Sequence, residues 1–274
     1  MDNKTILWKD NLKCAAMITI NLDAQYFGKI YYPDLDVNQG ECLTLGKTSL
    51  KEYLPKVLYS LDRYGAKASF FIPGAVAREY PDVIREIAER GHEIGCHGNY
   101  HENLALLTAE EQEKTLREAL LSLEMISGKP TVGFRMPEGE INRDTRRIVK
   151  KLGFCYSSSL SDDDVPYIDK ETGLVELPNH WELFDLPYFV FTWDPPIPNG
   201  QSRASNMKDV LENWLYELEG AKRFGTLFNL QLDPLTAGEQ GRIYMLDTIL
   251  EKITSDPEIW LATGKEIAEY ILML

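Results

Sequence analysis

The sequence has 274 residues, with 29 Lys and Arg against 43 Asp and Glu, and its formal net charge is −14 at pH 7. A hydrophobic fraction of 44% and a charged fraction of 26% are ordinary for a globular protein of this length, which can bury a sizeable core. The acidic balance argues against a protein that coats nucleic acid or anionic membranes, because both tasks need clustered Lys and Arg. With four His and four Cys in the chain, any metal or acid–base site must draw on few side chains.

The beginning of the chain and its cysteines indicate the compartment. The first ten residues are polar and charged and lack the apolar run of a secretory signal. No stretch reaches the roughly 18 apolar residues that span a bilayer. The cysteines are scattered, with no Cys-x-x-Cys pair, which disfavours a disulfide framework or a zinc knuckle. We therefore expect a cytoplasmic protein with reduced thiols and no membrane or nucleic-acid partner.

Apolar strand-like runs alternate with amphipathic helical stretches along the chain. In chain order, the predictions are strand 14–23, helix 50–64, strand 68–72, helix 81–90, strand 92–96, helix 108–126 with a capping box, strand 131–135, helix 142–152, strand 154–158, helix 207–224, strand 226–232, helix 242–255, strand 259–262 and helix 264–271. Residues 26–45 show no periodicity and are expected to lie over a site entrance. Residues 157–203 are expected to form loops and short strands over one rim.

This alternation predicts an α/β fold with a mostly parallel sheet, open or closed into a barrel. Seven or so βα units favour a barrel-like architecture. No shift in composition marks a boundary, so we expect a single domain over residues 1–274.

Polar side chains end the first predicted strand. In βα architectures the active residues sit where strands end, because loops there vary without disturbing the core. Strand side chains alternate, so Asn21 and Asp23 share one face. Such groups at the end of a buried strand cost desolvation unless they are paired or bind a ligand. The alternative is that Asp23 only caps the next turn.

Two histidines, His97 and His101, follow the third predicted strand. On a helical turn, their spacing of four places both imidazoles on one side, which suits a single cation. With Asp23 they would form a set of two His and one carboxylate, which leaves coordination positions open for water and substrate. Two surface or core histidines are the alternative for this motif alone.

Arg135 ends the fourth predicted strand and is followed by Pro137 and Gly139, which would give a fixed cation on a stiff turn. Arg135 could hold a carboxylate in a set orientation. The turn could also direct a backbone N–H, such as that of Glu138, at a developing oxyanion. A structural ion pair of Arg135 is the alternative.

Taken in order, these segments resemble the polysaccharide deacetylase superfamily, carbohydrate esterase family 4, over about residues 15–270. The motifs are the strand-end Asp23, Ser-Phe-Phe-Ile-Pro-Gly (69–74), Gly-His-Glu-Ile-Gly-Cys-His (91–97) with His101, and Arg-x-Pro-x-Gly (135–139). The His-Gly-x-x-His form, Glu-Leu-Pro (176–178), Trp181, and residues 185–189 and 260–264 are similar to the cytoplasmic branch of peptidoglycan-deacetylase-like proteins, allantoinase-like proteins and cyclic imide hydrolases.

The resemblance implies a distorted (β/α)7 barrel and homo-oligomers, either dimers or tetramers. It implies a divalent metal, usually zinc, on Asp23, His97 and His101. The implied chemistry is metal-assisted hydrolysis of C–N bonds, in which the cation polarises the amide carbonyl and binds the attacking water. A carboxylate acts as base, the Glu138 N–H helps to hold the oxyanion, and a late-motif His protonates the leaving nitrogen.

This chain departs from the family pattern at two catalytic positions, that of the general base and that of the general acid. The branch usually ends the first strand with Asp-x-Asp, but this chain has Asn21, and an amide cannot accept that proton at neutral pH. Arg135 thereby loses its expected anionic partner. Where the branch has His-Pro after a late strand, this chain has Asp233 before a Pro. We expect Asp233 to serve as base or acid, with Glu138 or Glu102 in reserve, and Asn21 to donate a hydrogen bond to substrate or water.

Three functions remain open. The first is a deacetylase-type hydrolase of non-peptide C–N bonds with rearranged acid–base groups. The second is ring opening of cyclic imides or allantoin-like ureides, where the leaving nitrogen is better stabilised and acid catalysis matters less. The third is a metal- or sugar-binding protein without turnover, because a fold does not fix a function. The cytoplasmic location favours a small-molecule or amino-sugar substrate.

The remaining predictions concern substrate contacts, an aromatic stretch and the other two histidines. We expect Trp181, Pro137 and Tyr26 to contact the substrate. The aromatic-rich stretch 181–193 could be a substrate wall, an oligomer interface or core. We expect His92 to be structural and His180 to be a rim residue without a special role.

Overall fold

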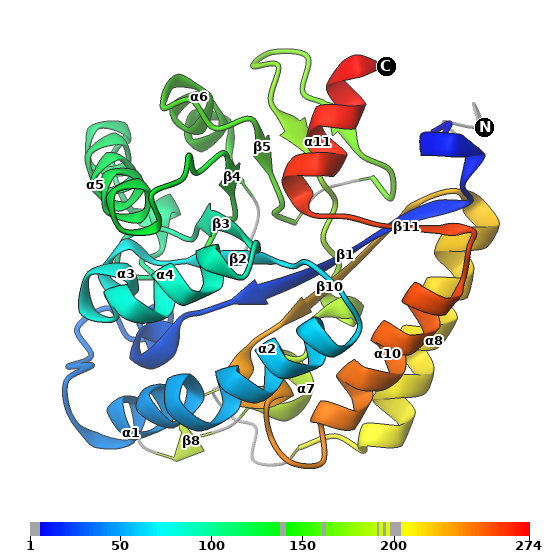
Figure 1. Ribbon diagram of the computed structural model, residues 1–274. Coiled ribbons are helices and arrows are strands. Elements are labelled where there is room, and N and C mark those ends of the chain that lie inside the picture. Colours follow the sequence, from blue (N-terminus) through cyan, green and yellow to red (C-terminus); the bar gives the residue numbers. More distant parts are fainter. Residues whose placement is uncertain (1–5, 138–140, 161–162, 191, 194–195, 198–203) are drawn as a thin grey trace.

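A fully buried strand, β1 (Cys14–Asn21), organises the fold. Both of its faces are buried, as is usual for strands of parallel sheets covered on two sides. One edge of β1 pairs in parallel with β10 (Leu227–Leu232), and the other pairs with β11 (Ile259–Leu261) and then β2 (Ser69–Ile72). Figure 1 shows this computed structural model, which describes residues 6–137, 141–160, 163–190, 192–193, 196–197 and 204–274.

The sheet continues from β2 through short strands and curls strongly. These strands are, in order across the sheet, β3 (Glu93–Cys96), β4 (Gly133–Phe134), β5 (Tyr156–Ser157), β7 (Val175–Glu176) and β6 (Tyr167–Ile168). All pairs in this sheet are parallel except β6 with β7. A separate hairpin joins β8 (Thr192–Trp193) to β9 (Pro196–Ile197).

In the described part of the chain the sheet does not close into a full barrel, because no ladder of hydrogen bonds joins β7 to β10. Residues 177–185 cross this gap instead, with single bridges from Asn179 to Leu160 and from Phe184 to Gln231. The result is one α/β domain with a half-barrel sheet, which confirms the predicted distorted barrel. The outer limits of the domain, predicted as residues 1–274, stay a prediction.

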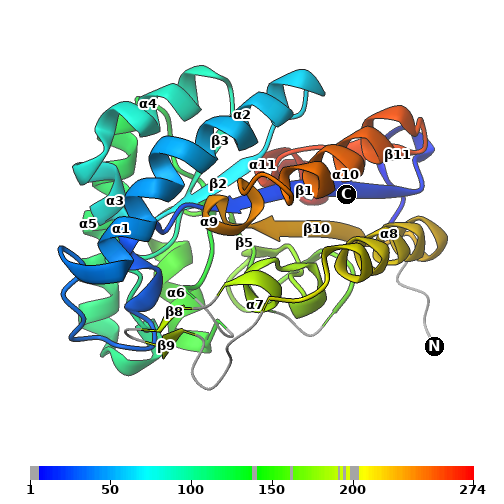
Figure 2. The same ribbon diagram turned by 90° about the horizontal axis from the view of Figure 1, so that it is seen from below.

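Helices cover the outside of the sheet, and α8 and α10 lie along β1, β10 and β11 (Figures 1 and 2). The helices are α1 (Gly40–Thr48), α2 (Leu54–Arg63), α3 (Gly74–Glu79), α4 (Pro81–Glu89), α5 (Ala109–Ser127), α6 (Arg143–Lys151), α7 (Leu186–Phe189), α8 (Met207–Phe224), α9 (Pro234–Ala237), α10 (Ile243–Ser255) and α11 (Gly264–Met273). Short helical turns are η1 (Lys9–Asn11), η2 (Ala24–Gly28), η3 (Ser49–Tyr53), η4 (Leu104–Leu106) and η5 (Trp181–Leu183).

Each predicted strand and helix occurs, with its ends within two residues of the prediction when η3 and α2 are taken as one helical stretch. The predicted capping box of α5 is confirmed, because Thr108 Oγ1 accepts from Glu111 N (3.3 Å) and Glu111 Oε2 accepts from Thr108 N (2.8 Å). Within the described residues, no helix is both long enough and apolar enough to cross a bilayer.

Candidate metal centre and pocket

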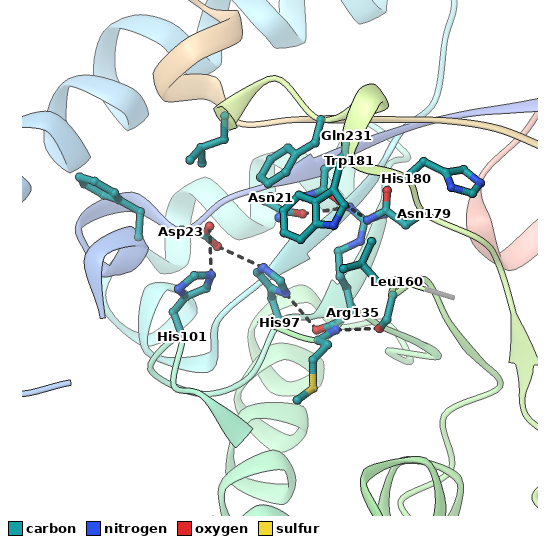
Figure 3. Close-up of a pocket in the computed structure, with 15 residues that line it drawn as sticks. Asn21, Asp23, His97, His101, Arg135, Leu160, Asn179, His180, Trp181 and Gln231 are labelled. Atoms are coloured by element: carbon teal, nitrogen blue, oxygen red, sulfur yellow. Dashed lines mark hydrogen bonds and ion pairs between the residues drawn. The ribbon is translucent and has the colours of Figure 1, made fainter. Parts of the chain in front are cut away.

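Asp23, His97 and His101 meet beyond the carboxyl ends of β1 and β3 (Figure 3). Asp23 lies between β1 and η2, and His97 directly follows β3. His97 Nε2 is 3.7 Å from Asp23 Oδ1, and His101 Nε2 is 3.3 Å from Asp23 Oδ2. One ligand atom of each residue lies within 4.8 Å of the others, and all three side chains are buried. The three residues therefore form a compact candidate site for one cation.

The two histidines come together as predicted, but the helical turn expected between them is wrong. No helix spans them, and the chain reverses through Gly98, whose φ is 74°. His101 itself has a φ of 57°, in the left-handed region that few residues other than Gly adopt. The two rings end 5.0 Å apart, centroid to centroid. A left-handed backbone, and not helical periodicity, brings His101 to the site.

Glu102, which was predicted as an alternative base, instead stabilises this reversal of the chain. Its carboxylate accepts from the backbone N–H of Asn99 (3.0 Å) and Tyr100 (2.6 Å). Thr115 Oγ1 donates to it as well, at 2.7 Å. Glu102 does not line the pocket. It holds the loop that carries His101.

The chemistry of the histidines fits a divalent cation. His97 Nδ1 is 2.9 Å from the carbonyl oxygen of Arg135, so a proton on Nδ1 donates to that oxygen and the Nε2 lone pair faces Asp23. His97 Nε2 is buried and has no hydrogen-bond partner among the described residues. Burial lowers the pKa of His97 well below its usual range and lowers the pKa of His101 to about 3. Both imidazoles are therefore neutral at physiological pH, which is the form that binds a metal.

The guanidinium of Arg135 is buried beside this triad and is satisfied by neutral oxygens alone. Nη1 donates to Thr19 Oγ1 (2.9 Å) and Asn21 Oδ1 (3.0 Å). Nη2 donates to Ser158 Oγ (2.8 Å) and Asn229 Oδ1 (3.5 Å), and Nε donates to Ser158 O (2.7 Å). Burial lowers its pKa to about 9. In the described part of the chain no carboxylate pairs with Arg135, so the structural ion pair considered from the sequence does not form there.

A small pocket adjoins the triad, with a cavity volume of about 30 Å³. This volume admits a few water-sized groups, since one water needs about 10–15 Å³. Asn21 and Arg135 line the pocket, and so does Trp181, as expected for a substrate contact (Figure 3). Asp23 is the only carboxylate among the described lining residues. The roles predicted for these residues stay predictions.

The other predicted site residues do not line the pocket. Tyr26 lies just after Asp23, but its hydroxyl donates to Glu79 Oε1 at 2.5 Å. Pro137 is not a lining residue. It lies beside Gly98, where a Cβ would come within 2.8 Å of the Pro137 ring. Glu138, expected to provide an oxyanion N–H, lies outside the described residues.

Asp233 is buried away from the pocket wall. Its Oδ1 accepts from Leu235 N at 2.7 Å and so caps α9, while its own N–H donates to Asp185 (3.1 Å). Burial raises the pKa of Asp233 to about 7 and raises that of Asp185 well above its usual range. The described geometry gives no support to a catalytic role for Asp233.

Four polar residues of the wall were missed or undervalued in the sequence: Ser159, Asn179, His180 and Gln231. Asn179 Nδ2 donates to Gln231 Oε1 at 2.5 Å, and His180 Nε2 lies 3.3 Å from Asp164 Oδ1. The signal for Gln231 was available, because it is a polar residue within an apolar strand, as Asn21 is in β1.

Comparisons with known proteins agree with this geometry. The family model for polysaccharide deacetylase matches residues 41–157, which include His97 and His101. Peptidoglycan deacetylase of Helicobacter pylori is 26% identical over 247 residues, which cover 80% of this chain and 83% of that protein. A Mycobacterium smegmatis structure, assigned as a polysaccharide deacetylase, is 30% identical with a TM-score of 0.91, and the match covers 98% of this chain and 93% of that one. An allantoinase structure shares the fold at a TM-score of 0.81 and 19% identity, over 96% of this chain and 92% of its own.

Proposed function

The chain belongs to the polysaccharide deacetylase family, and on that premise we propose that it is a metal-dependent hydrolase of non-peptide C–N bonds in a small amide or N-acetyl amino-sugar substrate. The observation that carries the proposal is the buried set of Asp23, His97 and His101. Three protein ligands leave coordination positions open for water and a substrate carbonyl, as catalytic sites do. We propose zinc as the cation, because two imidazoles and one carboxylate suit it.

A bound divalent cation would supply a Lewis acid and lower the pKa of a bound water. The residues of the chain position these groups. The Arg135 carbonyl holds the imidazole of His97 so that its Nε2 is presented to the cation. Asn21, held by Arg135, faces the pocket and offers a hydrogen bond to water or substrate. The proposal retains the Glu138 N–H as an oxyanion donor, the cytoplasmic location and the homo-oligomeric state.

A second candidate, ring opening of cyclic imides or ureides, is favoured by the polar wall of the pocket. An amide stands at position 21, and Asp233 caps α9 instead of lining the pocket. A wall with few acid–base groups suits a substrate whose leaving nitrogen is already stabilised. It demands less proton transfer than an acetamido sugar does.

One experiment tests both candidates. Metal content is measured on the purified full-length protein, and hydrolysis is screened with N-acetylglucosamine oligomers, succinimide and allantoin. The screen is run on the wild type, Asn21→Asp and His97→Ala. We expect one bound zinc per chain, zinc-dependent turnover of at least one substrate class, and a loss of about a hundredfold or more in His97→Ala, because a metal ligand is removed.

The pattern of turnover separates the functions. Wild-type deacetylation supports the first candidate, and wild-type ring opening supports the second. Activity on acetyl sugars in Asn21→Asp alone would identify a deacetylase disabled at its base. Sugar binding without turnover by either protein would identify a binding protein and contradict the proposal.

A further inference from the structure

We propose that α3 sets the spacing of the candidate metal ligands, and that Glu79 at its end is the positioning residue for Asp23. The proposal rests on the proposed function, because it concerns the same cation site. It gives a role to a helix that contributes no residue to the described lining of the pocket. Two sets of contacts carry it. The beginning of α3 contacts the loop that bears the histidines, and its end contacts the segment that follows Asp23.

The beginning of α3 holds the loop between the two histidines through its backbone. Gly74 N donates to Gly98 O at 3.1 Å, and Ala75 N donates to Asn99 O at 2.8 Å. These N–H groups belong to the first turn of α3, where a helix offers them no partner of its own. A Cβ on Gly74 would come within 2.6 Å of Asn99 Oδ1, so the close approach requires a glycine. The reversal that carries His101 is therefore fixed relative to α3.

Glu79, the last residue of α3, holds the segment after Asp23 with both oxygens of its carboxylate. Gln25 Nε2 donates to Glu79 Oε2 at 2.5 Å, and the Tyr26 hydroxyl donates to Glu79 Oε1 at 2.5 Å. Both donors belong to η2 and are buried. The Tyr80 hydroxyl donates to Gln25 Oε1 at 3.1 Å, which fixes the orientation of that amide. The end of α3 thus determines where η2 lies.

The backbone beside Asp23 explains why η2 must be held. Ala24 has a φ of 48°, in the left-handed region that costs free energy for a residue with a Cβ. A residue persists in this region only where the surrounding structure holds it there. Because Ala24 directly follows Asp23, its conformation sets the direction of the chain at the ligand. Loss of the Glu79 contacts would let Ala24 relax and would move Asp23 relative to the histidines.

Aromatic contacts link the same two segments to α3 and to α5. The ring of Tyr100, which precedes His101, lies 6.1 Å from the ring of Tyr26, centroid to centroid. The Arg78 guanidinium lies 5.5 Å from the centroid of the Tyr100 ring, and Arg78 Nη1 donates to Ser122 Oγ of α5 at 3.0 Å. In Figure 1, α3 lies between α5 and the blue segment that follows β1. The helix therefore braces both ligand-bearing segments against α5.

The test is the zinc affinity of the full chain, measured by competition with a chelating dye. Glu79→Gln keeps the size of the side chain but replaces one acceptor oxygen with a donor, which opposes Gln25 or Tyr26. We expect it to bind zinc about tenfold or more weakly, as the loss of a group that orients a metal ligand does. Tyr26→Phe removes one donor and should weaken zinc binding by about threefold or more. The double variant should bind about as weakly as Glu79→Gln, because both changes break the same contact.

Cobalt(II) serves as a spectroscopic probe of the same site, because its visible absorption depends on the geometry of its ligands. The spectrum of cobalt-loaded Glu79→Gln should differ from that of the wild type, whereas a loss of stability alone leaves the spectrum of the folded protein unchanged. Glu89→Gln is the matched control, since Glu89 is the exposed last residue of α4, as Glu79 is of α3. It removes the same charge and should keep the zinc affinity and the cobalt spectrum of the wild type. Thermal melts of the metal-free proteins confirm that each variant is folded.

The outcomes separate this proposal from the proposed function. Zinc affinity within about twofold of the wild type in both Glu79→Gln and Tyr26→Phe overturns the positioning role and leaves the hydrolase proposal intact. Equal weakening in Glu79→Gln and Glu89→Gln also overturns it, because charge and not the contact with η2 would then be responsible. Failure of the wild type to bind zinc contradicts both proposals. If Glu79→Gln does not fold, the zinc affinity and cobalt spectrum of Tyr26→Phe decide, and values equal to those of the wild type overturn the role of Glu79.

Discussion

At the scale of single residues, burial gives His92 a chemical property that can be measured apart from the site. Its ring is buried, its Nδ1 accepts from Ala68 N at 3.2 Å, and it lies 5.2 Å from the ring of Phe70. Desolvation by burial lowers the pKa of His92 to about 4 from an ordinary 6.5. The folded protein therefore holds His92 neutral over a pH range in which the unfolded chain protonates it.

We predict that His92 makes the free energy of unfolding depend on pH. Because its folded pKa is depressed, the stability is fully present above about pH 6.5 and is lost as the pH falls toward about 4. The loss reaches about 2–3 kcal/mol at the acid end of this window. His92→Asn, whose Oδ1 stands where Nδ1 does and keeps an acceptor for Ala68 N, should show a smaller difference in unfolding free energy between about pH 7.5 and about pH 4.5. Urea denaturation of both metal-free proteins measures this difference, and equal pH dependence would refute the prediction.

Residue types at strand ends were sufficient to predict the triad and the pocket position of Asn21. They were not sufficient for Asp233. The backbone N–H of Leu235, two residues later in the chain, donates to its carboxylate and decides where that carboxylate points. An Asp before a Pro that begins a helix is an N-cap pattern, so that signal was present. The left-handed backbone of His101 carried no such signal, because spacing alone does not specify φ.

At the scale of elements, the packing of α1 against η2 supports the metal site. Gly46 of α1 lies against the backbone of Gln25, two residues after Asp23, and a Cβ there would overlap Gln25 N. We predict that Gly46→Ala destabilises the protein by about 1–3 kcal/mol, as overpacking does. It should also weaken zinc binding, because η2 must move with Asp23. Chemical denaturation and zinc titration measure the two effects.

Gly220 provides the matched comparison for this prediction. It lies within α8, and a Cβ at this position would meet no atom within 4 Å. Gly220→Ala should therefore stabilise the protein by up to about 1 kcal/mol through helix propensity, with no change in zinc affinity. Loss of stability in both variants, or in neither, would contradict the role given to the contact between α1 and η2.

Periodicity predicted the long elements of the fold but missed α1 and α3. α1 buries only Cys42 and Gly46, so it lacks the apolar stripe that signals a helix. α3 has six residues and begins directly after Pro73, which reads as a turn signal in the sequence. Tertiary packing, not local pattern, stabilises both helices. The segment 177–185 that crosses the gap in the sheet was likewise not predictable, since its partners lie far away in the chain.

At the scale of the whole molecule, the triad joins parts of the chain that are distant in sequence. Asp23 follows β1 and the histidines follow β3, so a cation would link strands on either side of β2. Zinc at a hundredfold excess over its Kd should add about 2.7 kcal/mol to the free energy of unfolding. The melting temperature should rise by about 5 °C or more. Calorimetry with and without zinc measures the shift.

His101→Asn is the control for this shift. Asn tolerates a left-handed backbone better than most residues do, so the loop should keep its shape while a ligand imidazole is lost. The variant should melt near the metal-free wild type and gain little from zinc. A full thermal shift in His101→Asn would show that zinc stabilises the protein from another place.

The pairing of β1 also sets the order in which the chain can fold during synthesis. Ala15 pairs with Leu227 on one edge of β1, and Cys14 pairs with Ile259 on the other, so one whole edge and the beginning of the other wait for segments made more than 200 residues later. Trp8 Nε1 likewise donates to Gly225 O, across 217 residues. Closing such long loops is slow, and an apolar strand with an open edge invites association with other chains. The nascent protein therefore carries this long, fully buried strand with an open edge on the ribosome until β10 emerges, which makes β1 the segment that a chaperone would be expected to bind.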